Sequence, residues 1–586
     1  MNSTANAGEL LDVSIGKLRA QLRGYEQPSE VLTLETLRAI DYVFCRELFA
    51  DAADPNAPSE QELLIMSWGT NQALRRILPG HRNATHFRNF PSTERTRLLT
   101  DDFVLSCGSL AMAERLSAML QERLVQASVQ PVDREHAAFS DFENILVVTG
   151  QDRTLYSEVI GRKGLSWLSA QASTVDRPWE EDLERRHRTI LPELDRRVNV
   201  LQGWAMSYTS TKEIDAYFLE WGQLYLRRMT GQDMIGLDER LGENAYNEYL
   251  GILALLTGRA QKHLCYVSLL KHRHPHLSLR NLLTGFARVD GLVTWIAEQV
   301  DGEVRSISRL LDHLTLQSEN VALHTLRGDT AWAPTVRASD SFLILPMYGL
   351  EINPFLFLLN ELRARYEKDW FRAANNREKR WIAELESMFP ATRWHTNGRN
   401  LKLRYGKNVA TDIDFAVWDE LNNELGIFQL KWQQPVGLDN RARRSAGSNL
   451  VVEGNRWVQT VIAWLDSHGA HELAQRLGFT VSTSPAIRLF VVARYHAYFS
   501  GFGDHDSRAV WSDWSHFIKI RVENTGESLS GLTTLLEAEI AAARPSTNHE
   551  SYSFPLPEMA VVVNPIKVPR NAPNTSATKI DQRRDA

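Results

Sequence analysis

The sequence predicts an α+β multidomain protein: a mainly α-helical N-terminal region (residues 1–365), an α/β domain (366–545) and a C-terminal extension (546–586). Three observations lead to this prediction. The length of 586 residues exceeds what one hydrophobic core usually organises. Apolar residues recur at helical spacing from about residue 30 to 366, whereas strand-like alternation of apolar and polar residues dominates only after residue 400.

Composition limits the class of protein. The apolar content of 43% and charged content of 24% are typical of soluble globular chains. A net charge of −6 argues against indiscriminate coating of nucleic acid but permits a local basic groove. Cys45, Cys107 and Cys265 fit no zinc or disulfide spacing, which is typical of buried thiols in a reducing compartment. The chain starts without a secretory signal pattern, and prolines and polar residues interrupt its most apolar window (342–359), so we expect a cytoplasmic protein with no membrane partner.

Residues 210–231 show the helical period of the N-terminal region clearly. Ser210 and Glu213 form a candidate capping box, and Gly231 stands where a helix would end. Between them runs one apolar stripe: Ile214, Tyr217, Phe218, Trp221 and Tyr225. Comparable stripes lie near residues 60–78, 108–127, 240–272 and 290–316, and one short β-like run spans Ile145 to Val148. This region therefore predicts a scaffold, which would recognise a target, a partner protein or a second copy of the chain.

The α/β domain is predicted from an ordered series of patterns. They indicate a helix at 375–389, strands near 394–404, 411–418 and 425–432, a helix at 453–466 and a strand at 487–494. Past Pro545 the periodic pattern decays. The polar, proline-containing end from about residue 565 predicts a largely disordered tail.

The segment TDIDFAVWDELNNELGIFQLKW (411–432) carries the clearest chemical signal. In a strand, residues two apart share a face, and asparagines tolerate the positive φ of a tight hairpin turn. If Asn422–Asn423 form a two-residue turn, Asp414 pairs with Lys431 across the hairpin. One hairpin face would then collect Asp414, Gln429 and Lys431 within side-chain reach.

Such a face suits a hard divalent cation. Mg²⁺ takes oxygen ligands and usually keeps several waters beside one or two carboxylates. Asp414 offers a carboxylate, Gln429 an amide oxygen and Leu430 its backbone carbonyl. Lys431 can orient or deprotonate a water and offset negative charge in a phosphoryl transition state.

The spacing D–(x)14–Q-x-K, within a helix, three strands, a helix and a strand, resembles the PD-(D/E)xK nuclease superfamily over roughly residues 370–500. Glutamine in place of the second acidic residue resembles Mrr-like restriction endonucleases. The resemblance implies an αβββαβ core and a nuclease that uses Mg²⁺ or Mn²⁺ to hydrolyse nucleic acid. DNA is the favoured substrate, and restriction or antiphage defence is the implied setting.

The family often places a glutamate on its first helix near the metal, and Glu378 is the candidate here, as an accessory ligand beside Asp414. The uncharged Gln429 is expected to weaken metal binding in the absence of substrate. It leaves open a catalytically silent protein that binds or senses nucleic acid through a nuclease-like fold.

Basic residues after the second hairpin strand are candidates for nucleic-acid contacts. Arg441, Arg443 and Arg444 stand in a Gly/Ser-containing stretch expected to be a loop, and Arg456 lies on the polar side of the following helix. They could pair with phosphates. The alternative is a solvated loop.

Three further interpretations stay open. Asp412-Ile-Asp414 could belong to a nucleotidyltransferase, whose paired aspartates sit on one strand. The hairpin could be an ordinary exposed one, with Asp414 and Lys431 as a surface pair. The histidines of KHRHPH (271–276) could hold zinc, although Pro275 equally indicates a helix end.

Overall fold

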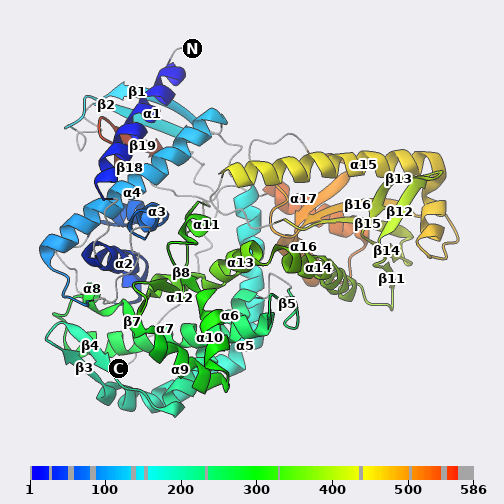
Figure 1. Cartoon of the computed structure of the whole chain (residues 1–586). Coiled ribbons are helices and arrows are strands. Elements are labelled where there is room, and N and C mark those ends of the chain that lie inside the picture. Colours follow the sequence, from blue (N-terminus) through cyan, green and yellow to red (C-terminus); the bar gives the residue numbers. More distant parts are fainter. Residues whose placement is uncertain are drawn as a thin grey trace.

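The computed structural model describes residues 3–25, 30–49, 58–78, 88–123, 125–132, 140–150, 156–230, 235–326, 330–433, 440–499, 505–542 and 551–564. Across them the protein is mixed α/β, with a helical N-terminal region and several small sheets (Figure 1). The α/β unit extends to one side of the N-terminal region in this view. A 42-residue helix, α5 (Tyr156–Arg197), runs between the two.

The α/β unit is built on a five-stranded sheet. Its strand order is β11 (Trp394–Asn397), β14 (Phe415–Asp419), β15 (Glu424–Lys431), β16 (Ala486–Ala493) and β17 (Ala509–Asp513). Strands β11, β14 and β15 are antiparallel neighbours, whereas β15, β16 and β17 run parallel. Every residue of β14 is buried, which is typical of strands covered by helices on both faces.

Helices cover both faces of this sheet. On one face α15 (Asn440–Arg476) packs Trp457, Val461 and Trp464 against Ile427 and other strand residues. On the other face lie α14 (Glu367–Ser387), α16 (Trp514–Glu523) and α17 (Leu529–Ala542). The order α14, β11, β14, β15, α15 and β16 agrees with the order that the sequence predicts. The predicted strands at 394–404 and 411–418 are each divided, however, and their inner parts, β12 (Leu401–Tyr405) and β13 (Asn408–Ile413), form a separate two-stranded sheet.

Phe428 lies at the centre of the face beneath α14 and α16. It is fully buried and stacks on Phe490 with ring centroids 4.5 Å apart, and Phe415 and Phe517 meet it edge-on. We expect Phe428→Ala to lower the free energy of unfolding of this unit by about 3–5 kcal/mol, because it removes a buried ring and leaves a cavity. Phe428→Leu should cost clearly less. Urea unfolding followed by tryptophan fluorescence measures both, and equal costs would contradict the packing argument.

The N-terminal region combines helices with two four-stranded sheets. Its long helices are α1 (Ser3–Leu22), α2 (Glu30–Cys45), α3 (Glu60–Ile77), α4 (Glu94–Gln121), α6 (Lys212–Thr230), α7 (Tyr246–Arg273), α9 (Val289–Val300), α13 (Pro354–Arg365) and, shorter, α10 (Val304–Asp312). One sheet has the order β7 (Gly285–Arg288), β10 (Phe342–Leu345), β9 (Thr335–Arg337) and β8 (Thr315–Leu316). The predicted helical stripes therefore fall mainly on helices. The stripe at 108–127 ends early, because α4 stops at Gln121. The stripe at 240–272 begins with the short strands β5 (Arg240–Leu241) and β6 (Asn244–Ala245), and the stripe at 290–316 ends in β8.

Helix α6 begins one residue later than the Ser210 cap predicts. The hydroxyl of Thr211 accepts the Ile214 N–H at 3.3 Å, while the Ser210 hydroxyl donates to Asp215. Gly222 of α6 and Gly258 of α7 let the two helices approach closely, since a Cβ on Gly222 would stand 2.1 Å from the Ala254 carbonyl oxygen.

The second sheet pairs strands of residues 125–150 with strands of residues 552–564. Its order is β1 (Val125–Pro131), β2 (Asn144–Gly150), β19 (Ala560–Asn564) and β18 (Tyr552–Pro555). The predicted β-like run at Ile145–Val148 is the core of β2, and β19 pairs with it in parallel. The C-terminal extension thus returns to the N-terminal region through residues 552–564. The predicted tail from residue 565 lies outside the described residues.

Two features bear on the predictions about compartment. Cys45 and Cys107 are buried free thiols, and Cys265 is a half-buried free thiol. Among the described residues, α4 alone is long and apolar enough to cross a membrane, and half of its most apolar window is buried inside the protein. It packs against α1, α2 and α3, as a core helix does.

Asp41 is a buried carboxylic acid in the N-terminal core. It accepts hydrogen bonds from the Thr284 hydroxyl (2.6 Å) and the Tyr348 N–H (2.8 Å), and burial raises its pKa to about 7 from 3.8. Between these two values the unfolded chain loses this proton while the folded protein keeps it. Stability from this group is therefore lost as the pH rises from about 4 to 7.

We expect Asp41→Asn to remove that pH dependence, because an asparagine can still accept the Tyr348 N–H. Between pH 5 and pH 8, the wild type should lose about 2–3 kcal/mol of its free energy of unfolding relative to the variant. Urea titrations at the two pH values measure the change. Parallel pH profiles of the two proteins would contradict the assignment.

Candidate active site

Asp414 stands at a break between two strands. β13 (Asn408–Ile413) pairs with β12 (Leu401–Tyr405) in a separate two-stranded hairpin, and β14 begins at Phe415. The Asp414 N–H donates to the Phe428 carbonyl oxygen at 3.1 Å, which holds the break against β15. Ile413 consequently joins the core under α15, whereas Phe415 joins the opposite core. In one continuous strand over 411–418, Ile413 and Phe415 would share a face, so this expectation from the alternating pattern is wrong.

The predicted two-residue turn is also wrong. Asp419 pairs with Glu424, so the loop has four residues, Glu420–Asn423, and only Asn423 has a positive φ (50°). The Asp419 carboxylate explains the longer loop, since it accepts the Leu421 N–H at 3.2 Å and the Asn422 side-chain amide at 2.8 Å. The register consequently moves by two residues, and Asp414 lies beside Gln429 rather than directly across from Lys431.

The shift preserves the faces and tightens the contact between two predicted site residues. One Asp414 oxygen, Oδ2, accepts the Leu430 N–H at 2.7 Å and also a hydrogen bond from the Gln429 amide nitrogen. Gln429 is buried. Lys431, next on the same face, is half-buried and places its Nζ 3.5 Å from an Oε2 of Glu453 on α15. The structure therefore brings Asp414, Gln429 and Lys431 together at one end of β15.

Negative charges converge on Asp414. The pKa of Asp414 is raised to about 7, chiefly by burial and also by the neighbouring carboxylates of Asp412 and Glu378, while the Leu430 N–H and Lys431 act in the opposite direction. Glu378 lies on the exposed side of α14, next to the buried residue Arg377. An excess of carboxylates over cations at a half-buried position favours a bound cation.

Whether a metal ion could bind here depends on the ligand atoms that these residues offer. Among the described residues, no three His, Cys, Asp or Glu side chains are close enough to form a metal site by themselves. Mg²⁺ needs fewer protein ligands, because it keeps waters beside one or two carboxylates. Asp414 and Glu378 can supply these, and the Leu430 carbonyl lies on the same strand edge as its N–H, facing Asp414. Gln429 would offer oxygen only after its amide turns over, since its nitrogen now donates to Asp414. With that rotation, these four residues offer the oxygen ligands that suit Mg²⁺.

The predicted basic loop is a helix. Residues from Asn440 onward belong to α15, because Arg and Ala are good helix formers and outweigh the Gly and Ser residues of that stretch. The side chains of Arg441 and Arg443 lie outside the described residues. Arg444 is exposed and lies 3.6 Å from Glu122, at the end of α4. Arg456 is exposed on α15, one turn beyond Glu453. Arg444 thus faces the N-terminal region, and of these four only Arg456 is described near the candidate site.

Two site residues escaped prediction. Asn400 points its side-chain amide toward both aspartates, 3.3 Å from an oxygen of Asp412 and 3.4 Å from one of Asp414. The Glu453 carboxylate accepts a hydrogen bond from the Lys431 ammonium. Its place on the polar side of the predicted helix at 453–466 was the available signal. No sequence signal indicated Asn400, because it comes close to Asp412 and Asp414 only through the β12–β13 hairpin.

The structure gives little support to the nucleotidyltransferase and zinc interpretations. Asp412 lies in β13 and Asp414 stands at the break that follows it, so the two aspartates do not share one strand as the paired aspartates of a nucleotidyltransferase do. α7 ends at Arg273, as Pro275 indicates, and Lys271 donates to the Pro275 and Leu277 carbonyls. Among the residues described, the KHRHPH histidines are not part of a metal-holding group.

No protein-family model, curated protein or solved structure matches this chain.

Proposed function

We propose that the chain is a metal-dependent nuclease that hydrolyses phosphodiester bonds of nucleic acid, with DNA the favoured substrate. The observation that carries the proposal is the convergence of Asp414, Gln429 and Lys431 at the end of β15, opposite Glu378 of α14. The order α14, β11, β14, β15, α15 and β16, with the β12–β13 hairpin inserted between β11 and β14, supports a PD-(D/E)xK-like αβββαβ core. A cytoplasmic enzyme of restriction or antiphage defence is the setting that this resemblance suggests.

Each residue has a role in this proposal. Asp414 and Glu378 would hold Mg²⁺ or Mn²⁺ together with Gln429 and the Leu430 carbonyl. A bound cation supplies a polarised phosphoryl oxygen and an acidified water. Lys431 would orient that water and offset the negative charge that develops on phosphate. Glu453 would position the ammonium of Lys431, and Arg456 would contact the nucleic-acid backbone.

The test is cleavage of plasmid, linear duplex, single-stranded DNA and RNA with Mg²⁺ or Mn²⁺. Lys431→Ala should abolish cutting while substrate binding persists. Lys402→Ala, a change of an exposed lysine on β12, is the matched control and should cut normally. Metal-dependent cutting that survives in Lys431→Ala would place the chemistry elsewhere.

A second function is favoured by one observation. Gln429 donates to Asp414 and no three acidic or histidine side chains of the described residues form a metal group, as in a nuclease-like fold that binds nucleic acid without cutting. Such a sensor would bind with a strong dependence on salt concentration and would lose affinity in Arg456→Ala. Absence of cutting by the wild type, together with salt-dependent binding, would favour this second function.

A further inference from the structure

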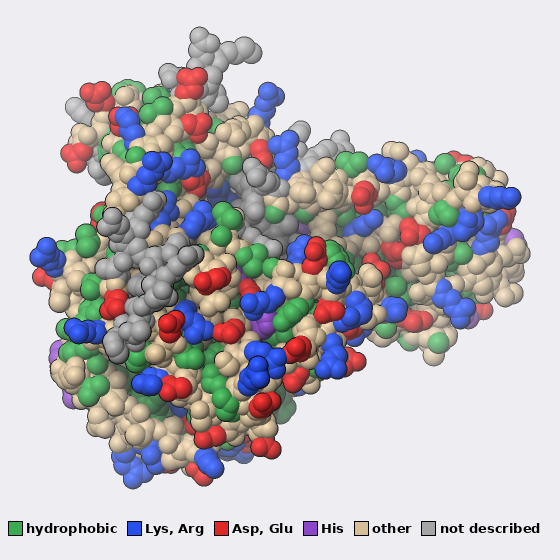
Figure 2. All heavy atoms as spheres, in the orientation of Figure 1, with side chains coloured by type: hydrophobic (Ala, Val, Ile, Leu, Met, Phe, Trp, Pro, Cys, Tyr) green, Lys and Arg blue, Asp and Glu red, His purple; other side chains and the backbone are tan. Residues whose placement is uncertain are grey.

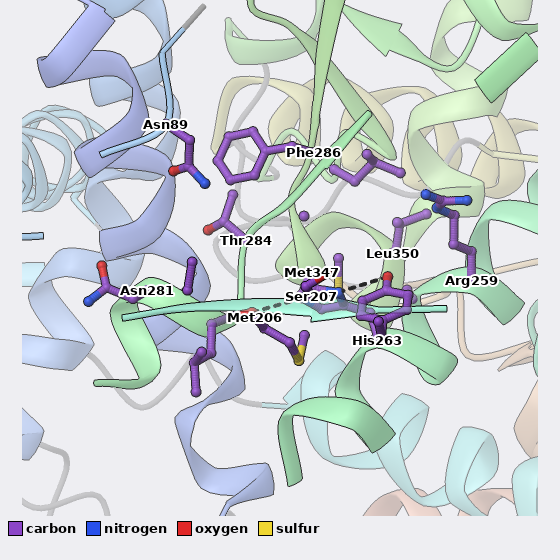
Figure 3. Close-up of a pocket in the computed structure, with 16 residues that line it drawn as sticks. Asn89, Met206, Ser207, Arg259, His263, Asn281, Thr284, Phe286, Met347 and Leu350 are labelled. Atoms are coloured by element: carbon purple, nitrogen blue, oxygen red, sulfur yellow. Dashed lines mark hydrogen bonds between the residues drawn. The ribbon is translucent and has the colours of Figure 1, made fainter. Parts of the chain in front are cut away.

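The N-terminal region contains a cavity of about 330 Å³ that the proposed nuclease site does not use. Strands β4 (Ala205–Tyr208), β7 and β10 meet α7, α8 (Leu279–Leu282) and α12 (Met347–Ile352) around it (Figure 3). Its size is within the range of small-molecule sites, roughly 300–1,000 Å³. One part of the lining is apolar: Met206, Phe286, Leu345, Met347 and Leu350.

The lining carries one formal charge. Among the described residues that line the cavity, Arg259 of α7 is the only lysine or arginine, and none is a carboxylate. The guanidinium stacks on the Trp295 ring at 5.1 Å, which holds it in place. No carboxylate of the described residues lies within ion-pair distance of it, in contrast to the neighbouring Lys262, which pairs with Asp215. A half-buried arginine held by an aromatic ring is suited to pair with an anion from outside.

The amides on the opposite side of the cavity are oriented as donors. The Asn89 side-chain oxygen accepts from Arg38 at 2.9 Å, and the Asn281 side-chain oxygen accepts the Ser92 N–H at 2.8 Å. Their oxygens are therefore committed to protein donors. Both side-chain NH₂ groups remain for a ligand, since neither donates to another described residue. Figure 3 shows Asn89 and Asn281 on one side of the cavity and Arg259 on the other.

His263 adds no charge to the cavity. Its Nε2 lies 2.8 Å from the Leu282 carbonyl oxygen and therefore carries the proton. Its Nδ1 then accepts from the Tyr208 hydroxyl at 3.1 Å. Burial lowers the pKa of His263 to about 4, so the ring is neutral near pH 7. The hydroxyl proton of Tyr208 is thus occupied. Among the described lining residues, the side chains still free to donate are those of Arg259, the two asparagines and Ser207.

We propose that this cavity binds a small organic anion: an apolar or aromatic body on the methionine, leucine and phenylalanine side chains, and a phosphate or carboxylate group at Arg259. The donor-rich lining calls for acceptor oxygens on the ligand, and the missing carboxylates leave the charge of Arg259 to be matched by the ligand. The site is independent of the proposed nuclease function, so Lys431→Ala should bind the same anion equally well.

The test is thermal denaturation and titration calorimetry of the full chain with four probes. Adenosine 5′-monophosphate and 4-hydroxyphenylacetate present the two acidic groups, and adenosine and inorganic phosphate each lack one half of the expected ligand. We expect at least one of the two organic anions to raise Tm, and neither half-ligand to match it. Arg259→Met should weaken that binding at least about tenfold, and Arg259→Lys should restore part of it.

Controls make the outcome decisive. Asn281→Asp keeps the acceptor for Ser92 but places a negative charge in the cavity, so it should also abolish binding. Arg188→Met, a change of an exposed arginine on α5, should bind like the wild type. Tm measured without probe reports whether each variant is folded. The proposal is overturned if neither organic anion raises Tm, if adenosine binds as well as its monophosphate, or if Arg259→Met binds normally.

Discussion

Asp414→Asn is expected to lower the rate of metal-dependent cleavage by at least about three orders of magnitude. The α/β unit of the variant should be at least as stable as that of the wild type. The activity falls because the variant loses the central carboxylate of the proposed metal site. The fold is kept because an asparagine oxygen can still accept the Leu430 N–H that now binds Asp414 at 2.7 Å. Stability can rise by about 1 kcal/mol near pH 8, since the change removes a half-buried charge that faces Asp412 and Glu378.

The experiment measures cleavage rate and urea unfolding on the same preparations. Asp466→Asn, a change of an aspartate far along α15, is the matched control and should alter neither quantity. Cleavage that persists in Asp414→Asn would remove Asp414 from the chemistry. A loss of several kcal/mol of stability would instead assign Asp414 a structural role in holding β13 and β14 to β15.

The sequence predicts which residues make up the candidate site, but not the strand register that places them relative to one another. Alternation in residues 425–432 correctly gives the two faces of β15, because successive side chains of a strand point to opposite sides of the sheet: Ile427 packs in the core under α15, whereas Phe428 and Leu430 pack in the opposite core. The register depends on Asp419, whose carboxylate binds two groups of the following loop and lengthens it. Side-chain hydrogen bonding of this kind competes with the simplest turn and leaves no periodic signal.

Contacts between residues that are distant in the sequence are likewise not predictable from local patterns. Arg444 approaches Glu122, and Asn400 approaches Asp412 and Asp414, only once the elements have packed. Helical periods predict which face of α14 or α15 is buried, but not which polar residue of a neighbouring element meets the exposed face. The cavity around Arg259 is of this kind as well, since its lining comes from segments between Asn89 and Leu350.

The second large effect is expected from ending the chain after Ala542. This truncation removes β18 and β19, and with β19 the parallel neighbour of β2. It also removes Phe554, Leu556, Met559 and Val561, which are buried in the same core as α1, α3 and α4. At about 1.5–3 kcal/mol for each buried side chain, the loss is at least about 6 kcal/mol, comparable with the whole stability of many domains.

We therefore expect this truncation to unfold the core that contains α1, α3 and α4, or to leave it aggregation-prone through the uncovered edge of β2. Ending the chain after Asn564 keeps every one of these contacts and is the matched control, which should melt like the full chain. Val561→Asp tests the same contact by a single change, because it buries a charge at a fully buried position. Calorimetry should show the N-terminal transition lost or lowered in both altered proteins, with the α/β unit less affected. An unchanged N-terminal transition after truncation at Ala542 would mean that β18 and β19 lie on this core without stabilising it.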